Sequence, residues 1–230
     1  MKGKLKSKQE IAEGTLQVIF ETDEPFSFTP GQYCFITLKV LKYPDERGNR
    51  RQFSIVNSPS EKGIITITTR LSESGFKKTL KELPVGTEVE LGPIAGVFTL
   101  PDDTKRPLVF IAGGIGITPF MSMLRHLKET GNKYNITLVY SNRNQNSTAF
   151  LSEIQNFKSI KLILTMTEDP GWSGEKGKID AGFIKEYFPD VNKNLFMVVG
   201  PPAMVESVQK ALLEAGTASE NIKIERFTGY

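Results

Sequence analysis

The chain has 230 residues, 39% of them hydrophobic and 24% charged, with a formal net charge of +3, which describes a folded protein of one or two domains. One cysteine (Cys34) and one histidine (His126) exclude a disulfide framework, a histidine-rich zinc site and an iron–sulfur cluster, which needs about four ligands. Basic residues barely outnumber acidic ones in 1–101 (14 against 12) and in 102–230 (15 against 14), so nucleic acid is not an expected partner.

The chain begins with a polar segment in which Lys2, Lys4, Lys6 and Lys8 alternate. We expect a solvated first strand or arm there, with no apolar leader. The longest apolar run, 108–121, is broken by three glycines and a proline, so no membrane span is expected. Together with the single cysteine, these features favour a cytoplasmic location.

The rest of the first hundred residues is typical of antiparallel β structure. Alternating or β-branched apolar runs between Gly and Pro turns predict strands, and helical spacing of apolar residues predicts one short helix at 74–83. We interpret residues 1–101 as a six-stranded antiparallel β-barrel. The predicted strands lie at 16–20, 33–40, 51–56, 64–69, 87–91 and 97–100.

After a polar linker with two prolines at 101–107, strand and helix patterns alternate. Continuous apolar runs predict buried parallel strands, and this alternation predicts an α/β domain with a doubly wound parallel sheet at 107–230. The predicted strands are 108–112, 136–140, 161–165, 195–199 and 222–226, and the predicted helices are 119–129, 149–156, 181–187 and 203–214.

Three glycines, Gly113, Gly114 and Gly116, follow the first predicted parallel strand and precede Thr118 and Pro119. Glycines at this place let a backbone approach a ligand closely, and the next helix N-terminus attracts anions. The pattern therefore favours a dinucleotide pyrophosphate site, although its spacing differs from the Gly-x-Gly-x-x-Gly of ordinary dehydrogenases. Thr118 suits the cap of that helix and Pro119 its first position. The alternative is a structural turn that needs positive φ.

The next parallel strand ends near Ser141 and Arg143. An Asp or Glu there would bind the ribose of NADH, whereas an arginine suits the 2′-phosphate of NADPH. An ordinary exposed arginine is the alternative. The fourth parallel strand also ends in a turn that enters a helix, where Gly200, Pro201 and Met204 are candidate nucleotide-binding residues.

Four motifs occur in one order along the chain: Arg51-Gln52-Phe53-Ser54, Gly-Gly-Ile-Gly-Ile-Thr-Pro from 113, Val-Val-Gly-Pro-Pro-Ala-Met from 198, and the terminal Glu-Arg-Phe-Thr-Gly-Tyr. Together they resemble the ferredoxin–NADP reductase family of flavoenzymes over nearly the whole chain. The resemblance implies a barrel that binds FAD, an α/β domain that binds NADPH or NADH, and the activity of an NAD(P)H-dependent flavoprotein reductase.

The resemblance also implies roles for barrel residues. Arg51 would bind a flavin phosphate, Phe53 would lie against the isoalloxazine ring, and Ser54 would act beside flavin N5. A core position for Phe53 and a surface ion pair for Arg51 are the alternatives. Further FAD contacts are implied for Thr68, Thr69, Gly75, Phe76 and Lys77.

At the C-terminus, Glu225, Phe227 and Tyr230 match the family pattern. Glu225 is the candidate proton relay, and Tyr230 would cover the flavin face and gate the nicotinamide. A packing role for Phe227 and a frayed end at Tyr230 are the alternatives. Two positions depart from the family: Phe53 replaces a Tyr, which removes one hydrogen bond, and Val199 replaces a Cys near the nicotinamide.

Three functions fit this sequence. The first is a reductase that delivers electrons to a ferredoxin, a flavodoxin or another iron–sulfur partner, with basic residues at 47, 50, 77 and 78 attracting an acidic carrier. The second is a reductase of small molecules such as free flavin or a ferric chelate. The third is a flavin-bearing electron-transfer subunit of a larger complex. Because one cysteine cannot hold an iron–sulfur cluster, we expect electrons to leave the flavin for a separate acceptor.

Overall fold

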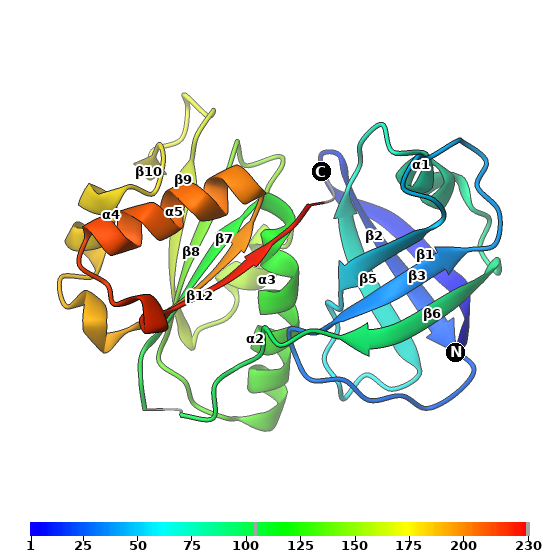
Figure 1. Ribbon diagram of the computed structural model, residues 1–230, viewed down its shortest axis with the longest axis horizontal. Coiled ribbons are helices and arrows are strands. Elements are labelled where there is room, and N and C mark those ends of the chain that lie inside the picture. Colours follow the sequence, from blue (N-terminus) through cyan, green and yellow to red (C-terminus); the bar gives the residue numbers. More distant parts are fainter. Residues whose placement is uncertain (104, 229–230) are drawn as a thin grey trace. The chain divides into compact units, whose positions relative to one another are not determined.

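The computed structural model describes residues 1–103 and 105–228, which divide into two compact units (Figure 1). Unit 1 contains residues 1–100 together with the helix at 118–130, and unit 2 contains 101–117 and the chain from 131 onward. The domain limits expected from the sequence place that helix in the second domain, whereas its contacts group it with unit 1.

Unit 1 is built on a six-stranded antiparallel sheet with the order β4-β3-β6-β1-β2-β5. The Val56 amide, just beyond β4, donates a hydrogen bond to the Thr66 carbonyl of β5 over 2.9 Å, which joins the two ends of this order into a barrel. The elements are β1 (Lys2–Ala12), β2 (Thr15–Thr22), β3 (Tyr33–Leu38), β4 (Arg50–Ser54), β5 (Ile64–Arg70), α1 (Gly75–Glu82) and β6 (Glu88–Ala95).

The barrel core follows from the alternation of side chains along each strand. Leu16, Val18 and Phe20 of β2 all point inward and are buried, as their spacing predicts. Helix α1 adds Phe76 and Leu80 to the same cluster. The six-stranded antiparallel barrel is thereby confirmed.

One predicted strand is wrong. Residues 97–100 form no strand, and Val97 is 93% exposed. The chain leaves β6 through Gly96, whose φ of +114° belongs to the left-handed region that favours glycine. The sixth strand is instead β1, the lysine-rich segment at the start of the chain, which pairs with both β2 and β6.

Unit 2 is built on a parallel sheet with the order β10-β9-β8-β7-β11-β12, and all its strand pairs are parallel. Its elements are β7 (Leu108–Gly113), η1 (Gly114–Ile117), β8 (Ile136–Asn142), α3 (Leu151–Gln155), β9 (Ile160–Met166), β10 (Glu175–Lys176), α4 (Ala181–Tyr187), η2 (Val191–Lys193), β11 (Leu195–Gly200), α5 (Pro202–Glu214), η3 (Ser219–Asn221) and β12 (Ile222–Arg226).

The strand order reverses direction at β7, with β8 on one side and β11 on the other. Helices α4 and α5 lie on the same face of the sheet, where Ile184 and Val205 pack against Val109 and Val198 (Figure 1). The doubly wound α/β fold is thereby confirmed. In folds of this kind, ligands bind at the carboxyl ends of the strands beside such a reversal.

Helix α2 (Thr118–Thr130) is fastened to the loop that follows β4. Ser122 donates a hydrogen bond to the carbonyl of Asn57 over 2.8 Å, and Arg125 donates one to the carbonyl of Val56 over 3.1 Å. Among the helices of the described residues, none is long and apolar enough to cross a membrane.

Candidate functional site

The carboxyl ends of three neighbouring strands in unit 2 bring predicted nucleotide residues together. Gly113 of β7 pairs with Ser141 of β8, and β11, which ends at Gly200, lies on the other side of β7. These three residues therefore share one edge of the sheet, beside the reversal of strand order. Parallel pairing produces this arrangement, because it aligns all carboxyl ends on one side.

The glycines of the first turn have a packing reason that is independent of any ligand. A Cβ at Gly113 would lie 2.1 Å from the sulfur of Met204, and a Cβ at Gly116 would lie 2.4 Å from the carbonyl oxygen of Val199. Gly114 has a φ of +52°, as the structural-turn interpretation expects. Met204 therefore packs against the backbone of this turn, at the start of α5.

Two residues after the glycines begin α2. The 3₁₀ turn η1 runs directly into the helix, so Thr118 is the first residue of α2 rather than a cap outside it, and Pro119 is the second. Both residues are buried. By its contacts this helix belongs to unit 1, so the structure places the two residues with the barrel.

A cavity of about 260 Å³ opens beside Ser141 and Met204. Its polar lining consists of hydroxyl groups and one cation, and it includes no carboxylate; Arg143 is exposed and does not line it. The sequence reasoning missed the cation, because β10, the strand that precedes it, has two residues and no recognisable pattern. The polar lining residues are Ser141, Thr167, Lys178 and Ser207.

Asn142, the last residue of β8, was also missed. Its side chain is 95% buried (5% exposed), and neither its Nδ2 nor its Oδ1 atom has a hydrogen-bond partner. A buried amide without partners is unfavourable by about 1–3 kcal/mol for each group. Such a residue at the ligand-binding edge of a parallel sheet fits a site that a bound molecule completes.

Glu225 lies on β12, opposite Val199 of β11. Its Oε2 atom is buried without a partner, and this burial raises the pKa of the carboxyl to about 7. A carboxyl with such a pKa can hold or release a proton near neutral pH. After β12, the Phe227 amide donates a hydrogen bond to the Gly200 carbonyl over 2.9 Å, which keeps this part of the chain beside β11. Tyr230, the predicted gate, lies outside the described residues.

In unit 1, strand β4 carries the predicted flavin motif. The Phe53 ring lies 5.8 Å from that of Phe76, packed against the barrel core, and the Arg51 guanidinium lies 5.4 Å from the Phe76 ring centre. Ser54 ends the strand and is buried. Phe53 is half-buried, so part of its ring can still face a ligand.

Arg51 makes an ion pair with Asp45 that is buried rather than exposed. The side chains are 9% and 6% exposed, and the arginine also donates hydrogen bonds to the carbonyls of Arg47, Gly48 and Arg50, over 2.7, 2.9 and 2.8 Å. It therefore fixes the loop between β3 and β4.

Four cations converge near α1. Lys77 is 7% exposed, and burial, helped by the charges of Arg47, Arg51 and Arg70, lowers its pKa to about 8. Because it is buried, Lys77 does not offer the carrier-attracting surface expected for it. A converging set of cations fits a ligand with phosphates.

The two predicted threonines lie on β5, and their side chains alternate across the strand. Thr68 points away from the core face that Ile65 and Ile67 occupy, and its Oγ1 is buried without a partner. Thr69 is also buried, and its hydroxyl bonds the carbonyl of Arg70 over 3.3 Å. An unpaired buried hydroxyl fits a polar ligand such as the ribityl chain of FAD.

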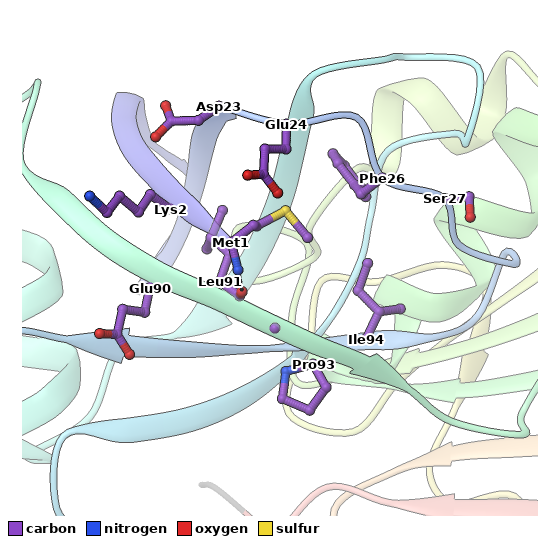
Figure 2. Close-up of a pocket in the computed structure, with 11 residues that line it drawn as sticks. Met1, Lys2, Asp23, Glu24, Phe26, Ser27, Glu90, Leu91, Pro93 and Ile94 are labelled. Atoms are coloured by element: carbon purple, nitrogen blue, oxygen red, sulfur yellow. Dashed lines mark hydrogen bonds between the residues drawn. The ribbon is translucent and has the colours of Figure 1, made fainter.

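A larger hollow of about 960 Å³ lies elsewhere in unit 1 (Figure 2). Figure 2 shows the carboxylates of Asp23, Glu24 and Glu90 around it, with Phe26 and Ile94 on its apolar side. It contains none of the predicted site residues, and no sequence signal singled it out. Among the described residues, no group of three or more His, Cys, Asp or Glu side chains could hold a metal ion.

Comparisons with known proteins bear on both units. The profile of the oxidoreductase FAD-binding domain matches residues 2–99, and that of the oxidoreductase NAD-binding domain matches residues 110–210. The reductase component of phenol 2-monooxygenase from a Pseudomonas species is 30% identical over 214 residues, which cover 89% of this chain and 59% of that protein. Sulfhydrogenase 1 subunit gamma of Pyrococcus furiosus is 29% identical over 88% of this chain and 69% of its own length.

Two solved structures show the same fold. The FAD/NAD-binding domain of nitric oxide dioxygenase from Vibrio cholerae superimposes with a TM-score of 0.84 at 19% identity, over 98% of each chain. Phthalate dioxygenase reductase gives a TM-score of 0.77 at 22% identity, over 98% of this chain and 67% of its own. The chain spans about 60% of the length of phenol 2-monooxygenase reductase component, so that relative contains further sequence.

Proposed function

Because the chain belongs to the ferredoxin reductase-like family of flavoprotein NAD(P)H oxidoreductases, we propose that it takes hydride from NADPH onto FAD and delivers electrons to a separate acceptor. The acceptor would be a ferredoxin, a flavodoxin or another iron–sulfur protein. The observation that carries this proposal is the meeting of Gly113, Ser141 and Gly200 at the reversal of a parallel sheet, in a chain that also has an FAD-binding domain. We place FAD binding in residues 1–101 and nucleotide binding in 107–230.

FAD, when bound, supplies the chemistry that accepts hydride and releases electrons. The protein's own residues bind and orient it. Arg51 and Lys77 would hold its phosphates, Phe53 would pack against its ring, and the Thr68 hydroxyl would gain the partner that it lacks. Ser54 would donate a hydrogen bond to the ring.

Glu225 would hold the proton that accompanies hydride transfer, since its raised pKa lets it exchange a proton near neutral pH. The backbone of the turns at Gly113 and Gly200 would bind the nucleotide pyrophosphate, and Met204 would fix the distance between the two turns. Pro201, Gly114 and Gly116 would shape these turns without contacting the reacting atoms. We assign a gating role to Tyr230.

NADPH is the favoured donor. The cavity beside Ser141 contains the Lys178 cation and three hydroxyl groups, and none of its lining residues is acidic. An acidic residue there would repel the 2′-phosphate of NADPH, whereas a lysine attracts it. Arg143 is exposed and follows the last residue of the same strand, so we keep it as a second candidate contact for the 2′-phosphate.

The relatives support a separate protein acceptor. The phenol 2-monooxygenase relative is a reductase component, and phthalate dioxygenase reductase transfers electrons from pyridine nucleotides to a [2Fe-2S] centre. The single cysteine of this chain cannot hold such a centre. We also propose a cytoplasmic location, because the buried free thiol of Cys34 fits a reducing compartment.

The test is anaerobic reduction of the purified, FAD-loaded protein. We expect the flavin absorbance to bleach on addition of NADPH, faster than with NADH at equal concentration, and to recover on addition of oxidised ferredoxin or flavodoxin. Recovery with free flavin or a ferric chelate alone would identify a small-molecule reductase. If neither nucleotide reduces the bound flavin, the protein is no NAD(P)H reductase, and the remaining hypothesis is a flavin-bearing electron-transfer subunit of a larger complex.

A further inference from the structure

Asp45 lies in the loop between β3 and β4, and its carboxylate contacts the N-terminus of α1, where the resemblance places flavin phosphate contacts. One carboxylate oxygen, Oδ2, accepts hydrogen bonds from the Phe76 amide over 2.9 Å and from the Ser74 hydroxyl over 2.7 Å. The other, Oδ1, accepts from Arg51, the arginine of the flavin motif, and from the Arg47 amide over 3.0 Å. A carboxylate therefore uses the donors that would serve a phosphate.

The contacts of the surrounding loop show that Asp45 is held there firmly. A Cβ at Gly75 would lie 2.2 Å from the Pro44 carbonyl oxygen, so the loop rests directly on the first residue of α1. The preceding residue, Tyr43, donates a hydrogen bond from its hydroxyl to Glu82 at the far end of the helix over 2.7 Å. The loop thus runs along α1 and delivers the carboxylate to its N-terminus.

The Asp45 carboxyl group remains ionised at neutral pH. The Phe76 amide, chiefly, then Ser74, Arg47 and Arg51, hold the pKa of Asp45 well below its usual range, against the opposing effect of burial. A flavin phosphate brings a second anion to the same donors. One amide hydrogen cannot serve both, and two anions at contact distance repel strongly where water is largely excluded.

We propose that Asp45 is an internal substitute for the cofactor phosphate, which holds Phe76, Ser74 and Arg51 in the flavin-free protein and is displaced when a flavin phosphate takes those donors. This inference rests on the proposed flavin site. It makes Asp45 a residue that stabilises the flavin-free barrel and weakens flavin binding. The competing outcome is that Asp45 supports the site by orienting Arg51 toward the cofactor.

The experiment compares the flavin-free full chain with its Asp45→Asn variant, which keeps the shape of the side chain and removes its charge. We expect FAD to bind about tenfold more tightly to the variant, and FMN likewise, because both carry phosphate. Riboflavin, which has none, should bind equally to both proteins. Quenching of flavin fluorescence measures each dissociation constant.

Glu73→Gln is the matched control. Glu73 is 94% exposed and pairs with Lys78, so this substitution removes one negative charge from the same region and leaves the hydrogen bond of the Phe76 amide in place. We expect it to change FAD affinity by less than about twofold. An equal gain in both variants would mean a general charge effect and overturn the proposal. So would weaker or unchanged FAD binding in Asp45→Asn.

A second measurement needs no substitution and covers the case in which Asp45→Asn fails to fold. Hydrogen exchange of the wild-type amides reports the loop directly, because the Arg47 amide is bonded to Asp45. We expect FAD to speed exchange at Arg47 while slowing it at Phe76. Slower exchange at both amides would show that Asp45 stays in place and overturn the proposal. A wild-type chain that binds no flavin would instead contradict the proposed function.

Discussion

Met204 lies directly over Gly113: any Cβ at position 113 would be 2.1 Å from the methionine sulfur. Gly113 is the last residue of β7, and Met204 lies in the first turn of α5, directly after β11, the strand that pairs with β7. The contact therefore fixes the separation of the two backbone segments to which we assign the nucleotide.

Gly113→Ala tests this relationship. We expect it to lower the free energy of unfolding of unit 2 by about 1–3 kcal/mol, because the added methyl forces Met204 and the α5 turn apart, and to raise the KM for NADPH. Urea unfolding followed by the fluorescence of Trp172, the one tryptophan of the chain, measures the first effect. Gly171→Ala is the control, because a Cβ at Gly171 would lie 3.7 Å from its nearest neighbour, an ordinary van der Waals distance. Equal effects of the two substitutions would contradict the role of the Met204 contact.

Lys178→Gln tests the choice between NADPH and NADH. We expect the KM for NADPH to rise about tenfold and that for NADH to change less than about twofold, since only NADPH carries the phosphate that a cation attracts. Steady-state kinetics with both nucleotides measures the ratio. Arg143→Ala should act in the same direction, and more weakly if the cavity cation is the main contact. Equal increases in KM for the two nucleotides would show that this cavity does not bind the 2′-phosphate.

Arg51→Lys tests the flavin motif. The lysine keeps a positive charge beside Asp45 but loses the planar fork that bonds the loop carbonyls, so we expect FAD retention to fall about tenfold. Flavin content after gel filtration measures the loss. Arg50→Lys is the matched control on the same strand; its guanidinium lies 4.2 Å from the Phe35 ring, and its replacement should leave flavin content unchanged. Full flavin content in Arg51→Lys would show that the planar guanidinium is not needed to retain FAD and would contradict this prediction.

Glu225→Gln tests the buried carboxyl through stability. The pKa of Glu225 is raised to about 7 in the folded chain, so the folded state binds a proton more tightly than the unfolded state, and stability declines as pH rises from about 4.5 to 7. We expect the glutamine variant to be more stable than the wild type near pH 8, by at most about 3 kcal/mol, and equally stable near pH 4. The exposed Glu220→Gln is the control. A difference that does not vary with pH would contradict the assignment.

The sequence predicts the fold well because both sheets carry strong periodic patterns. The alternation of Leu16, Val18 and Phe20 predicts a strand buried on one face, and the continuous apolar run of β7 predicts a strand buried on both faces. The prediction is wrong at 97–100. Val97 and Phe98 are residue types typical of strands, but the preceding Gly96 turns the chain out of the sheet. Local residue types do not report whether a partner strand is available.

The candidate site is predictable only in part. The glycine turns and the Arg51 motif have local signals, whereas Asp45 and Lys178 reach their places through loop contacts between segments far apart in sequence. The packing reason for Gly113 likewise depends on Met204, about ninety residues later. Such contacts are set by tertiary structure and leave no periodic trace in the chain.

The attachment of α2 to the loop after β4 has a practical consequence for dissecting this protein. A fragment that stops at Leu100 would carry all six strands of the barrel but would leave the Val56 and Asn57 carbonyls without their donors from α2. The unit that matches the FAD-binding domain is therefore discontinuous in sequence, and a fragment designed to preserve these contacts would include residues 118–130. A designed linker from Leu100 to that helix would place all of unit 1 on one continuous chain.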